Sequence, residues 1–398
     1  MSLISKQVPV IRSDAEALSV ARELAAHFKR ESAVRDRDRR LPLDELELFS
    51  HTGLWGITVP QAWGGAGVSN VTLAQVVALI AAADASLGQI PQNHFYALEV
   101  LRVNGTPAQQ ARLYAEVLAG QRFGNALAEI GTKTAHDRTT HLARAEDGYR
   151  ITGRKFYATG ALYAQRIPTS VVDDNGVQHL AFVPRDSDGL TVIDDWSGFG
   201  QRTTGSGSVL FDNVFVAADD VIPFQSAFER PTPVGPLAQI LHAAIDTGIA
   251  RAAFEDALHF VRTKTRPWID ATSDIASEDP LTLKSFGRLS VRLHAAEALL
   301  ERAGELLDIA QANTHAGTVA AASIAVAEAR AISTEISLAA GSTLFELAGS
   351  QATLAEHGLD RHWRNARVHT LHDPVRWKYH AIGNYYLNDE NPPLRGTI

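Results

Sequence analysis

Cysteine is absent from the 398 residues of the chain. Its absence excludes disulfide bonds, a thiolate nucleophile and zinc sites built on cysteine. No apolar run reaches the roughly 18 residues that a membrane span needs, because Gln75 and Asp84 interrupt the longest one. Residues 1–20 lack a basic region followed by an apolar core. We therefore expect no signal peptide and a cytoplasmic protein.

Basic residues are fewer than acidic ones, with 37 Lys and Arg against 45 Asp and Glu. The formal net charge is −8 and no basic block is present, so we expect no nucleic-acid surface. The chain is long enough for two or three packed subdomains. It contains no P-loop and no G-x-G-x-x-G after a strand-like run, which argues against the common nucleotide-binding loops.

The hydrophobic pattern changes period twice along the chain. Apolar residues at helical spacing, with residues typical of helix ends, predict helices over residues 14–40, 41–56, 71–88 and 106–120. Short, partly alternating runs between residues 122 and 230 predict strands. Apolar residues at helical spacing predict a helix over residues 234–264, and two long alanine-rich helices are predicted over residues 281–312 and 317–349. Strands between two helical blocks, without βαβ alternation, argue against a Rossmann fold.

These periods predict an α+β, mostly α fold with three parts. They are an N-terminal helical domain over residues 1–121, a β domain over 122–230 and a C-terminal helical domain over 231–398. Within the β domain, residues 178–194 show two apolar runs split by a polar turn at Gly189. Residues 207–223 are expected to form a pair of strands with a turn at Asp212–Asn213.

Residues 369–373 place His369, His372 and Asp373 within five positions. Two histidines three residues apart can share one helical face, and Pro374 is expected to end or kink that helix. Such a cluster can bind a metal, exchange protons or only pack. The three directions rarely converge on one ion, and no H-E-x-x-H motif is present, so we expect no metal site. Residues 205–208, "GSGS", do not form the strand–turn–helix motif of a serine hydrolase.

Polar and glycine residues of the β domain suit a flat cofactor. Backbone amides, the Thr159 hydroxyl and the Trp196 indole would fit the polar edge and apolar face of a flavin, with Asn125, Gly160 and Ser197 nearby. From the residues alone, a strand position for Thr159 and a core position for Trp196 remain alternatives.

Several motifs together resemble one family. They are residues 53–69, 124–134, 153–164, 198–216, 329–353 and 360–374. They are similar to segments of the acyl-CoA dehydrogenase superfamily, and the resemblance covers essentially the whole chain. It implies a C-terminal four-helix bundle, a flavin contacted by Thr159, and a homotetramer in which residues 329–353 reach the cofactor of a neighbouring subunit.

The chain departs from the dehydrogenases where they hold their base. A dehydrogenase needs a carboxylate that removes a proton next to the thioester. At one base position of the superfamily this sequence has His372 and Asp373, and around the other it has Ala238 and Gln239. An FAD-dependent acyl-CoA dehydrogenase with Asp373 as base is one alternative, and a flavin-free structural or regulatory relative is another.

Residues 86–101 and 364–388 instead resemble flavin-dependent monooxygenases of the dibenzothiophene monooxygenase and sulfur-acquisition type. This branch takes reduced FMN from a separate flavin reductase and oxidises a small organosulfur compound through a C4a-hydroperoxyflavin. The resemblance implies that His94 and His372 flank the reactive edge of the flavin, while Asn125 and Thr159 hold the peroxide or N5. Ala158 stands where related chains often have serine. Because this branch uses reduced FMN, the resemblance implies FMN as the preferred cofactor, and FAD is the alternative.

The phosphate end of the cofactor is expected at residues 261–268, with Arg266 as the first choice and Lys264 as the second. The resemblance places Gly349 and Ser350 at the cofactor of a neighbouring subunit. The residues expected to bind the cofactor are Ala158, Thr159, Gly160, Trp196, Lys264, Arg266, Gly349, Ser350 and Asp373.

Overall fold

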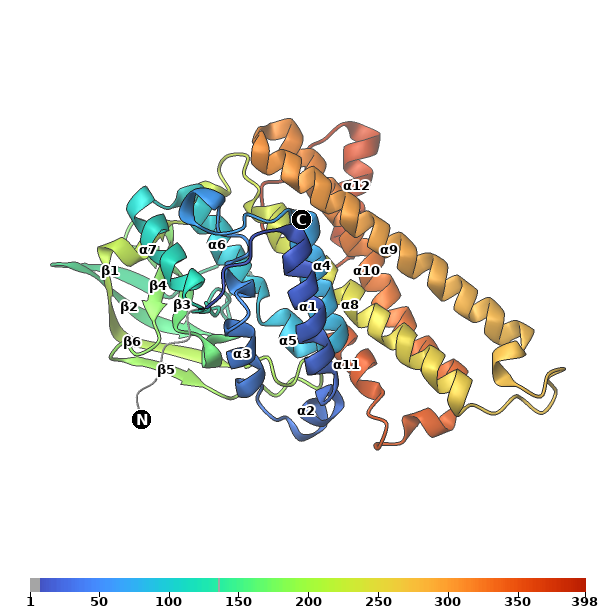
Figure 1. Ribbon diagram of the computed structural model, residues 1–398. Coiled ribbons are helices and arrows are strands. Elements are labelled where there is room, and N and C mark those ends of the chain that lie inside the picture. The colour runs from blue at the N-terminus through green and yellow to red at the C-terminus, as the bar shows by residue number, and fades with distance from the viewer. Residues whose placement is uncertain (1–7, 135–136) are drawn as a thin grey trace.

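The computed structural model describes residues 8–134 and 137–398. Its N-terminal helices lie between a β-sheet and a group of long C-terminal helices (Figure 1). The N-terminal helices are α1 (Asp14–Lys29), α2 (Ser32–Asp38), α3 (Leu43–Ser50), α4 (Asn70–Ala83), α5 (Ala85–Gln89), α6 (Gln92–Asn104) and α7 (Pro107–Leu118). The C-terminal helices are α8 (Val234–Thr263), α9 (Pro280–Ala312), α10 (Ala316–Ala348), α11 (Asp360–His369) and α12 (Arg376–Asn388).

Local capping explains where the N-terminal helices begin and end. Thr106 and Gln109 form a reciprocal capping box at the start of α7. The expected helix over residues 71–88 is wrong as one element, because the Asp84 side chain accepts hydrogen bonds from the next backbone amides and starts α5. The expected helix over 14–40 is likewise divided into α1 and α2. The pattern did not indicate α6.

The described strands form one seven-stranded sheet with the order β5-β6-β2-β1-β3-β4-β7. They are β1 (His141–Ala145), β2 (Gly148–Lys155), β3 (Arg166–Asp173), β4 (Gln178–Pro184), β5 (Leu190–Ile193), β6 (Ser208–Ala217) and β7 (Val221–Pro223). The expected turn at Asp212–Asn213 is wrong, because β6 continues through it. Asn213 has φ +53°, and the β2–β6 register shifts beside it. These residues therefore form a bulge inside one strand.

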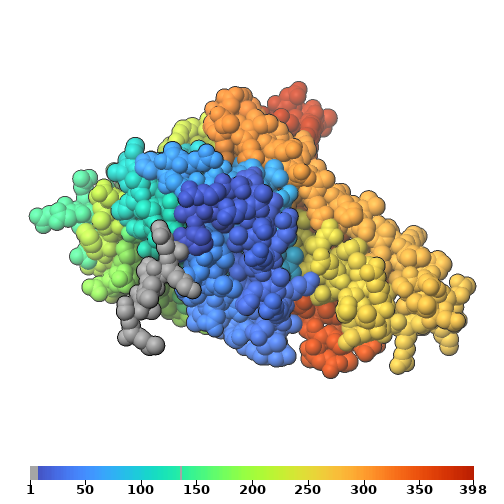
Figure 2. Space-filling model, in the orientation of Figure 1, coloured from blue at the N-terminus to red at the C-terminus, as the bar shows by residue number. Residues whose placement is uncertain are grey.

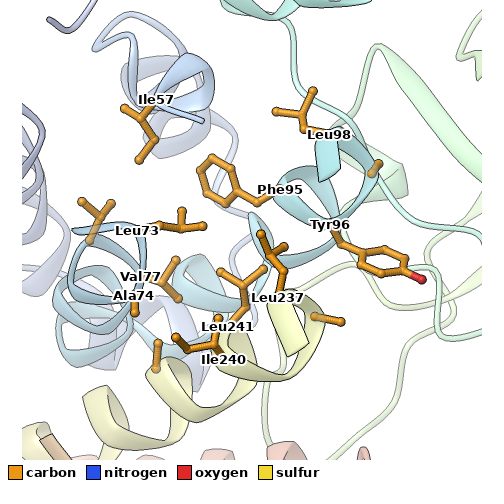
Figure 3. Packing of buried hydrophobic residues seen from close by; sticks show 14 of the residues in the cluster. Ile57, Leu73, Ala74, Val77, Phe95, Tyr96, Leu98, Leu237, Ile240 and Leu241 are labelled. Carbon is orange, nitrogen blue, oxygen red and sulfur yellow. The ribbon is translucent and has the colours of Figure 1, made fainter. Parts of the chain in front are cut away.

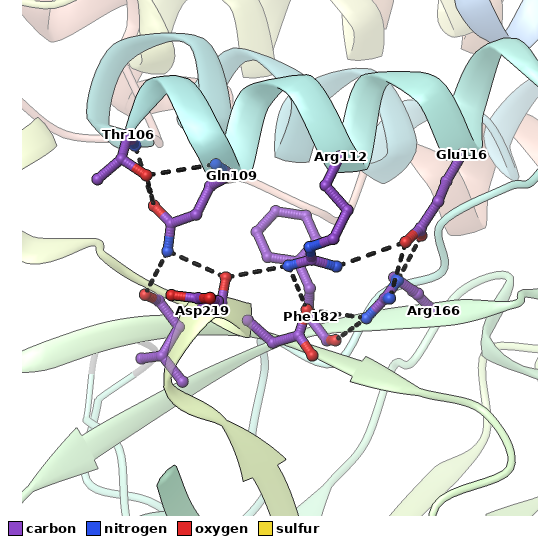
Figure 4. Close-up of polar contacts among 9 residues, drawn as sticks. Thr106, Gln109, Arg112, Glu116, Arg166, Phe182 and Asp219 are labelled. Carbon is purple, nitrogen blue, oxygen red and sulfur yellow. Dashed lines mark hydrogen bonds and ion pairs between the residues drawn. The ribbon is translucent and has the colours of Figure 1, made fainter. Parts of the chain in front are cut away.

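Helix α7 is fixed on the sheet by a polar network (Figure 4). Arg166 on β3 binds both oxygens of Glu116 on α7, at 2.5 and 2.8 Å. Arg112 reaches Asp220 at 2.7 Å, and the Gln109 amide donates to backbone carbonyls near β7. Paired contacts between a guanidinium and a carboxylate are strong, and they also fix the relative orientation of the two groups. They hold the N-terminal helices and the sheet in one orientation.

The main hydrophobic core joins α4, α6 and α8 (Figure 3). Phe95 of α6 lies beside Val77 of α4 and Leu241 of α8, and all three are almost fully buried. Helix α10 packs against α8, α9, α11 and α12. Its small side chains allow these helices to approach on several sides.

The space-filling view shows the N-terminal helices between the sheet and the C-terminal helices (Figure 2). Within the described parts of the chain, no helix combines the length and the apolar character that a membrane crossing requires. The expected order of helices, strands and helices is confirmed.

Candidate active site

The loop after β2 carries the residues that were expected to hold a flavin. The backbone turns through positive φ at Tyr157 (+56°) and at Gly160 (+76°). The Asn125 side-chain amide donates to the Tyr157 carbonyl at 3.1 Å, and the Gly160 N–H donates to the Thr204 carbonyl at 2.9 Å. Positive φ at a residue with a large side chain costs about 1–3 kcal/mol and is often retained at functional sites. The structure thus brings Asn125, Thr159 and Gly160 together.

A chain of buried hydroxyl groups lies behind Thr159. Its Oγ1 is 2.7 Å from Ser206 Oγ, which is 2.6 Å from Thr204 Oγ1. Ala158 is also buried and provides only a methyl group. Sequence reasoning missed the roles of Ser206 and Thr204. Residues 205–208 were considered as a possible nucleophile motif and as part of the family-like segment 198–216, and neither hydroxyl was given a role there.

The serines of residues 205–208 do not form a hydrolase triad. Ser208 Oγ donates to Asp195 at 2.7 Å, and this bond fixes the start of β6. In the part of the chain that the structure describes, neither Ser206 nor Ser208 contacts a histidine. The sequence-based argument against a serine hydrolase agrees with this geometry.

Trp196 packs beside the same loop. Its ring lies edge-on to Tyr157, with 6.2 Å between the ring centroids, and its Nε1–H donates to the Gln201 carbonyl at 2.9 Å. The Gln201 N–H donates to Asn365 on α11 at 2.7 Å. Trp196 is thus a partly buried residue whose loop is tied to the helix that precedes His372.

His372 lies beyond the end of α11, in a turn before Pro374. The expectation that His369 and His372 share one helical face is therefore wrong. His372 Nδ1–H donates to the His369 carbonyl at 2.7 Å, which leaves Nε2 to accept from the Gln89 amide at 3.0 Å. Burial of the ring and the nearby His369 lower the pKa of His372 below its ordinary value. The residue as a whole is exposed, while both ring nitrogens are held in hydrogen bonds.

A buried network lies behind His372. His369 Nδ1–H donates to Asp246 on α8 at 2.6 Å, and Arg330 on α10 pairs with the same carboxylate. His242 Nδ1 is 3.2 Å from His369 Nε2. Sequence reasoning missed His242, Asp246 and Arg330. Charged residues flanked by apolar and small residues in these helices were the available signal, since buried charges need partners.

The three histidines also have the composition of a metal site. One ring nitrogen each from His242, His369 and His372 lies within 4.8 Å of the others. Hydrogen bonds to Asp246, to Gln89 and between the rings already account for these orientations. The expectation that no metal binds here stays a prediction.

Neither base position of the dehydrogenases offers a free carboxylate. Gln239 Oε1 accepts from Lys378 Nζ at 3.0 Å, and its amide donates to the Gly396 carbonyl at 2.7 Å. Asp373 is buried, with 3.8 Å between its carboxylate and Lys378 Nζ. Burial lowers the pKa of Lys378 to about 8, although Asp373 opposes that shift. Asp373 therefore belongs to a polar cluster with α12.

The Thr159 loop and His372 face a common region at the end of α5. The Gln89 side chain contacts His372, and the next residue, Ile90, would be 3.4 Å from a Cβ placed on Gly160. Gln89 Oε1 and both amide atoms of Gln201 are buried without a hydrogen-bond partner in the described residues. Unpaired buried groups cost about 1–3 kcal/mol each. A flavin, which has both donors and acceptors on its pyrimidine edge, fits this chemistry.

His94 is placed differently from His372. It is fully buried, its Nε2–H donates to the Trp55 carbonyl at 2.9 Å, and its Nδ1 accepts from the Phe123 N–H at 3.0 Å. Both nitrogens therefore bind backbone groups and tie α6 to the segment that leads to Asn125. A part in proton transfer stays a prediction for His94, and this geometry supports a structural role.

We expect His94 to make the protein sensitive to acid. Burial lowers the pKa of His94 from 6.5 to about 4. Between these values the unfolded chain binds a proton that the folded chain does not, so the free energy of unfolding falls as the pH falls. The full effect is about 3 kcal/mol. Urea unfolding from pH 7 to pH 4 should show a shallower pH dependence in His94→Phe than in the unmodified protein, and equal slopes would contradict this.

The residues expected at the phosphate lie at the far end of the C-terminal helices (Figure 1). Lys264 follows α8 and Gly349 follows α10, and the two ends are joined by a hydrogen bond from Thr265 to the Ala348 carbonyl at 3.4 Å. Lys264, Arg266 and Ser350 are exposed. Helix α8 rises about 32 Å between His242 and Thr263. One FMN molecule cannot contact both His372 and this end within a single chain.

Two family models match the N-terminal and C-terminal parts of the chain, and known relatives align over nearly its whole length. The model of the acyl-CoA dehydrogenase N-terminal domain matches residues 14–121, and that of the C-terminal domain matches residues 240–377. A probable FMNH2-dependent monooxygenase, SfnC of Pseudomonas putida, is 33% identical over 96% of this chain and 98% of its own length. A dibenzothiophene monooxygenase of Mycolicibacterium goodii is 33% identical and covers 95% of each chain.

Solved structures agree in fold. The FMN-bound TdsC from Paenibacillus sp. A11-2 superimposes with a TM-score of 0.92 at 32% identity, over 96% of this chain and all of that one. Methanesulfinate monooxygenase MsuC from Pseudomonas fluorescens gives a TM-score of 0.89 at 31% identity, over 96% of this chain and 99% of that one. Butyryl-CoA dehydrogenase from Megasphaera elsdenii shares the fold at 18% identity, with a TM-score of 0.82.

Proposed function

The chain belongs to the acyl-CoA dehydrogenase family, and from this premise we propose that it is a reduced-FMN-dependent monooxygenase. It oxidises a small organosulfur compound, in sulfur acquisition, and takes FMNH2 from a separate flavin reductase. The support is that relatives which align over nearly its whole length are FMNH2-dependent or dibenzothiophene monooxygenases.

The observation that carries this proposal is the chemistry at the two dehydrogenase base positions. Gln239 is an amide bound to Lys378, and Asp373 lies beside the same ammonium group. Neither is a free carboxylate that can remove a proton from an acyl thioester. The titratable side chain beside Gln89 is instead the His372 imidazole, which can donate or accept a proton during oxygen transfer.

Reduced FMN, when bound, supplies the electrons that activate oxygen. The protein's own residues bind, orient and exchange protons. His372 has a fixed tautomer, because its Nδ1–H is committed to the His369 carbonyl, and Nε2 is the atom that takes up or gives a proton. Because burial and His369 lower the pKa of His372, a proton placed on Nε2 is readily transferred onward.

The test supplies FMN, a flavin reductase and NADH under air, with a panel of sulfones, sulfinates and thioethers. We expect an oxygenated product that requires both the reductase and this protein. If every sulfur compound remains unchanged while an acyl-CoA reduces protein-bound FAD anaerobically, the protein is a dehydrogenase. A protein that takes up neither FMN nor FAD would be a flavin-free relative.

We also propose a homotetramer in which neighbouring subunits complete the cofactor site. The support is the distance of about 32 Å along α8 between His242 and the end that carries Lys264 and Arg266. The end of one chain would bind the phosphate of an FMN whose ring lies beside His372 of another. Light scattering that shows a monomer at working concentration would contradict this arrangement.

Arg266→Ala is expected to weaken FMN binding roughly 10- to 100-fold, because a hydrogen bond to a charged group contributes about 1.5–3 kcal/mol. Riboflavin, which lacks the phosphate, should bind the variant and the unmodified protein equally. Arg262→Ala is the matched control, since Arg262 is an exposed arginine in the last turn of α8. An equal loss of FMN and riboflavin binding would exclude a phosphate contact.

A further inference from the structure

The three buried hydroxyl groups behind the flavin loop form a continuous chain. Thr159, Ser206 and Thr204 are at most 4% exposed. Their oxygens are 2.7 and 2.6 Å apart, and Thr204 Oγ1 is 2.9 Å from the Gln201 carbonyl oxygen. These distances are normal for hydrogen bonds between hydroxyl groups.

The proton count gives this chain a direction. Each hydroxyl has one proton to donate and two lone pairs to accept with. The Gln201 carbonyl can only accept, so Thr204 donates to it. Ser206 must then donate to Thr204, and Thr159 must donate to Ser206. The Thr159 oxygen is left with lone pairs alone for any ligand.

We propose that this directed chain makes the protein select reduced FMN over oxidised FMN. The inference rests on the proposed function, which places the flavin beside Thr159. N5 of reduced FMN carries a proton and can donate to Thr159, whereas N5 of oxidised FMN has a lone pair. Two lone pairs face each other unless Thr159 turns its proton away from Ser206.

Reversal of the chain has a definite cost. For Thr159 to donate to oxidised FMN, it must turn its proton away from Ser206. Either the bond from Thr159 to Ser206 is then lost, or Ser206 and Thr204 also turn and the bond from Thr204 to the Gln201 carbonyl is lost. One neutral hydrogen bond corresponds to roughly a three- to tenfold difference in affinity. Such a preference suits an enzyme that takes up FMNH2 as a substrate and releases oxidised FMN.

The experiment measures dissociation constants of FMN, in air, and of FMNH2, anaerobically, by titration of the full-length protein. Ser206→Ala frees the Thr159 proton, so oxidised FMN should bind more tightly. The preference for FMNH2 should then fall roughly three- to tenfold. Thr204→Val removes the acceptor of Ser206, allows the same reversal and should have the same effect. Ser208→Ala is the matched control, because Ser208 donates to Asp195 and lies outside the chain.

Separate outcomes test the flavin placement and the hydroxyl chain. If Thr159→Val changes neither dissociation constant, the flavin does not lie at Thr159 and its proposed placement is wrong. If Thr159→Val changes either constant while Ser206→Ala and Thr204→Val both keep the original ratio, the flavin placement stands and the directed chain is overturned. Should one of these two variants fail to fold, the other decides.

Discussion

A His372→Ala variant is expected to fold, bind FMN and lose at least about a hundredfold of its rate of product formation. A positioned acid or base contributes about 10²- to 10⁴-fold. The hydrogen bonds of His372 to the His369 carbonyl and to Gln89 fix which nitrogen exchanges protons. Because the proposed function places flavin reduction on a separate reductase, electrons should continue to arrive in the variant.

We expect oxygen consumption to become uncoupled from oxidation of the organosulfur compound. Oxygen consumption and hydrogen peroxide release should continue in His372→Ala while organosulfur oxidation falls. Both products should be measured in one reaction with saturating FMNH2. His380→Ala is a suitable control, since His380 is exposed on α12 and its ring lies edge-on to that of Trp377, with 5.3 Å between the ring centroids. Product formation at the unmodified rate in His372→Ala would remove His372 from the mechanism.

The sequence indicated a turn after the strand-like run at residues 149–156 because the signals for it are local, while the flavin contact of Thr159 stays a prediction. Thr159 and Gly160 follow a strand-like run, and Gly160 has the positive φ that glycine adopts without strain. The ends of α8 and α10 were also predicted within a residue or two. Helical spacing and nearby polar turns are contained within one segment, so no knowledge of tertiary contacts was needed.

The network behind His372 could not be predicted in this way. His369 is paired with Asp246, 123 positions earlier in the chain, and Asp246 with Arg330 on a third helix. Only the packing of α8, α10 and α11 brings them together. The expected turn within β6 failed for a related reason. Asp212 and Asn213 favour turns locally, but pairing with β2 on both sides keeps them in a bulged strand.

Asp246→Asn is expected to destabilise the protein by about 3–5 kcal/mol, because removing one partner of a buried ion pair leaves the other charge uncompensated. Asp246 and Arg330 are at most 1% exposed, and Arg330 Nε already lacks a partner in the described residues. Burial raises the pKa of Asp246, but His369 and Arg330 outweigh it and lower that pKa. The carboxylate is therefore charged in the folded protein at neutral pH, and the loss should appear there as a lower midpoint of urea unfolding.

A double variant separates stability from function. Asp246→Leu with Arg330→Met replaces both charges by apolar side chains and should recover most of the lost stability. It still removes the carboxylate that orients His369, whose carbonyl in turn fixes His372. We expect this double variant to remain folded and to leak hydrogen peroxide. If the double variant is stable and its oxygen consumption stays coupled to product formation, the buried ion pair serves folding alone. If Asp246→Asn is as stable as the unmodified protein, the ion pair contributes nothing to stability.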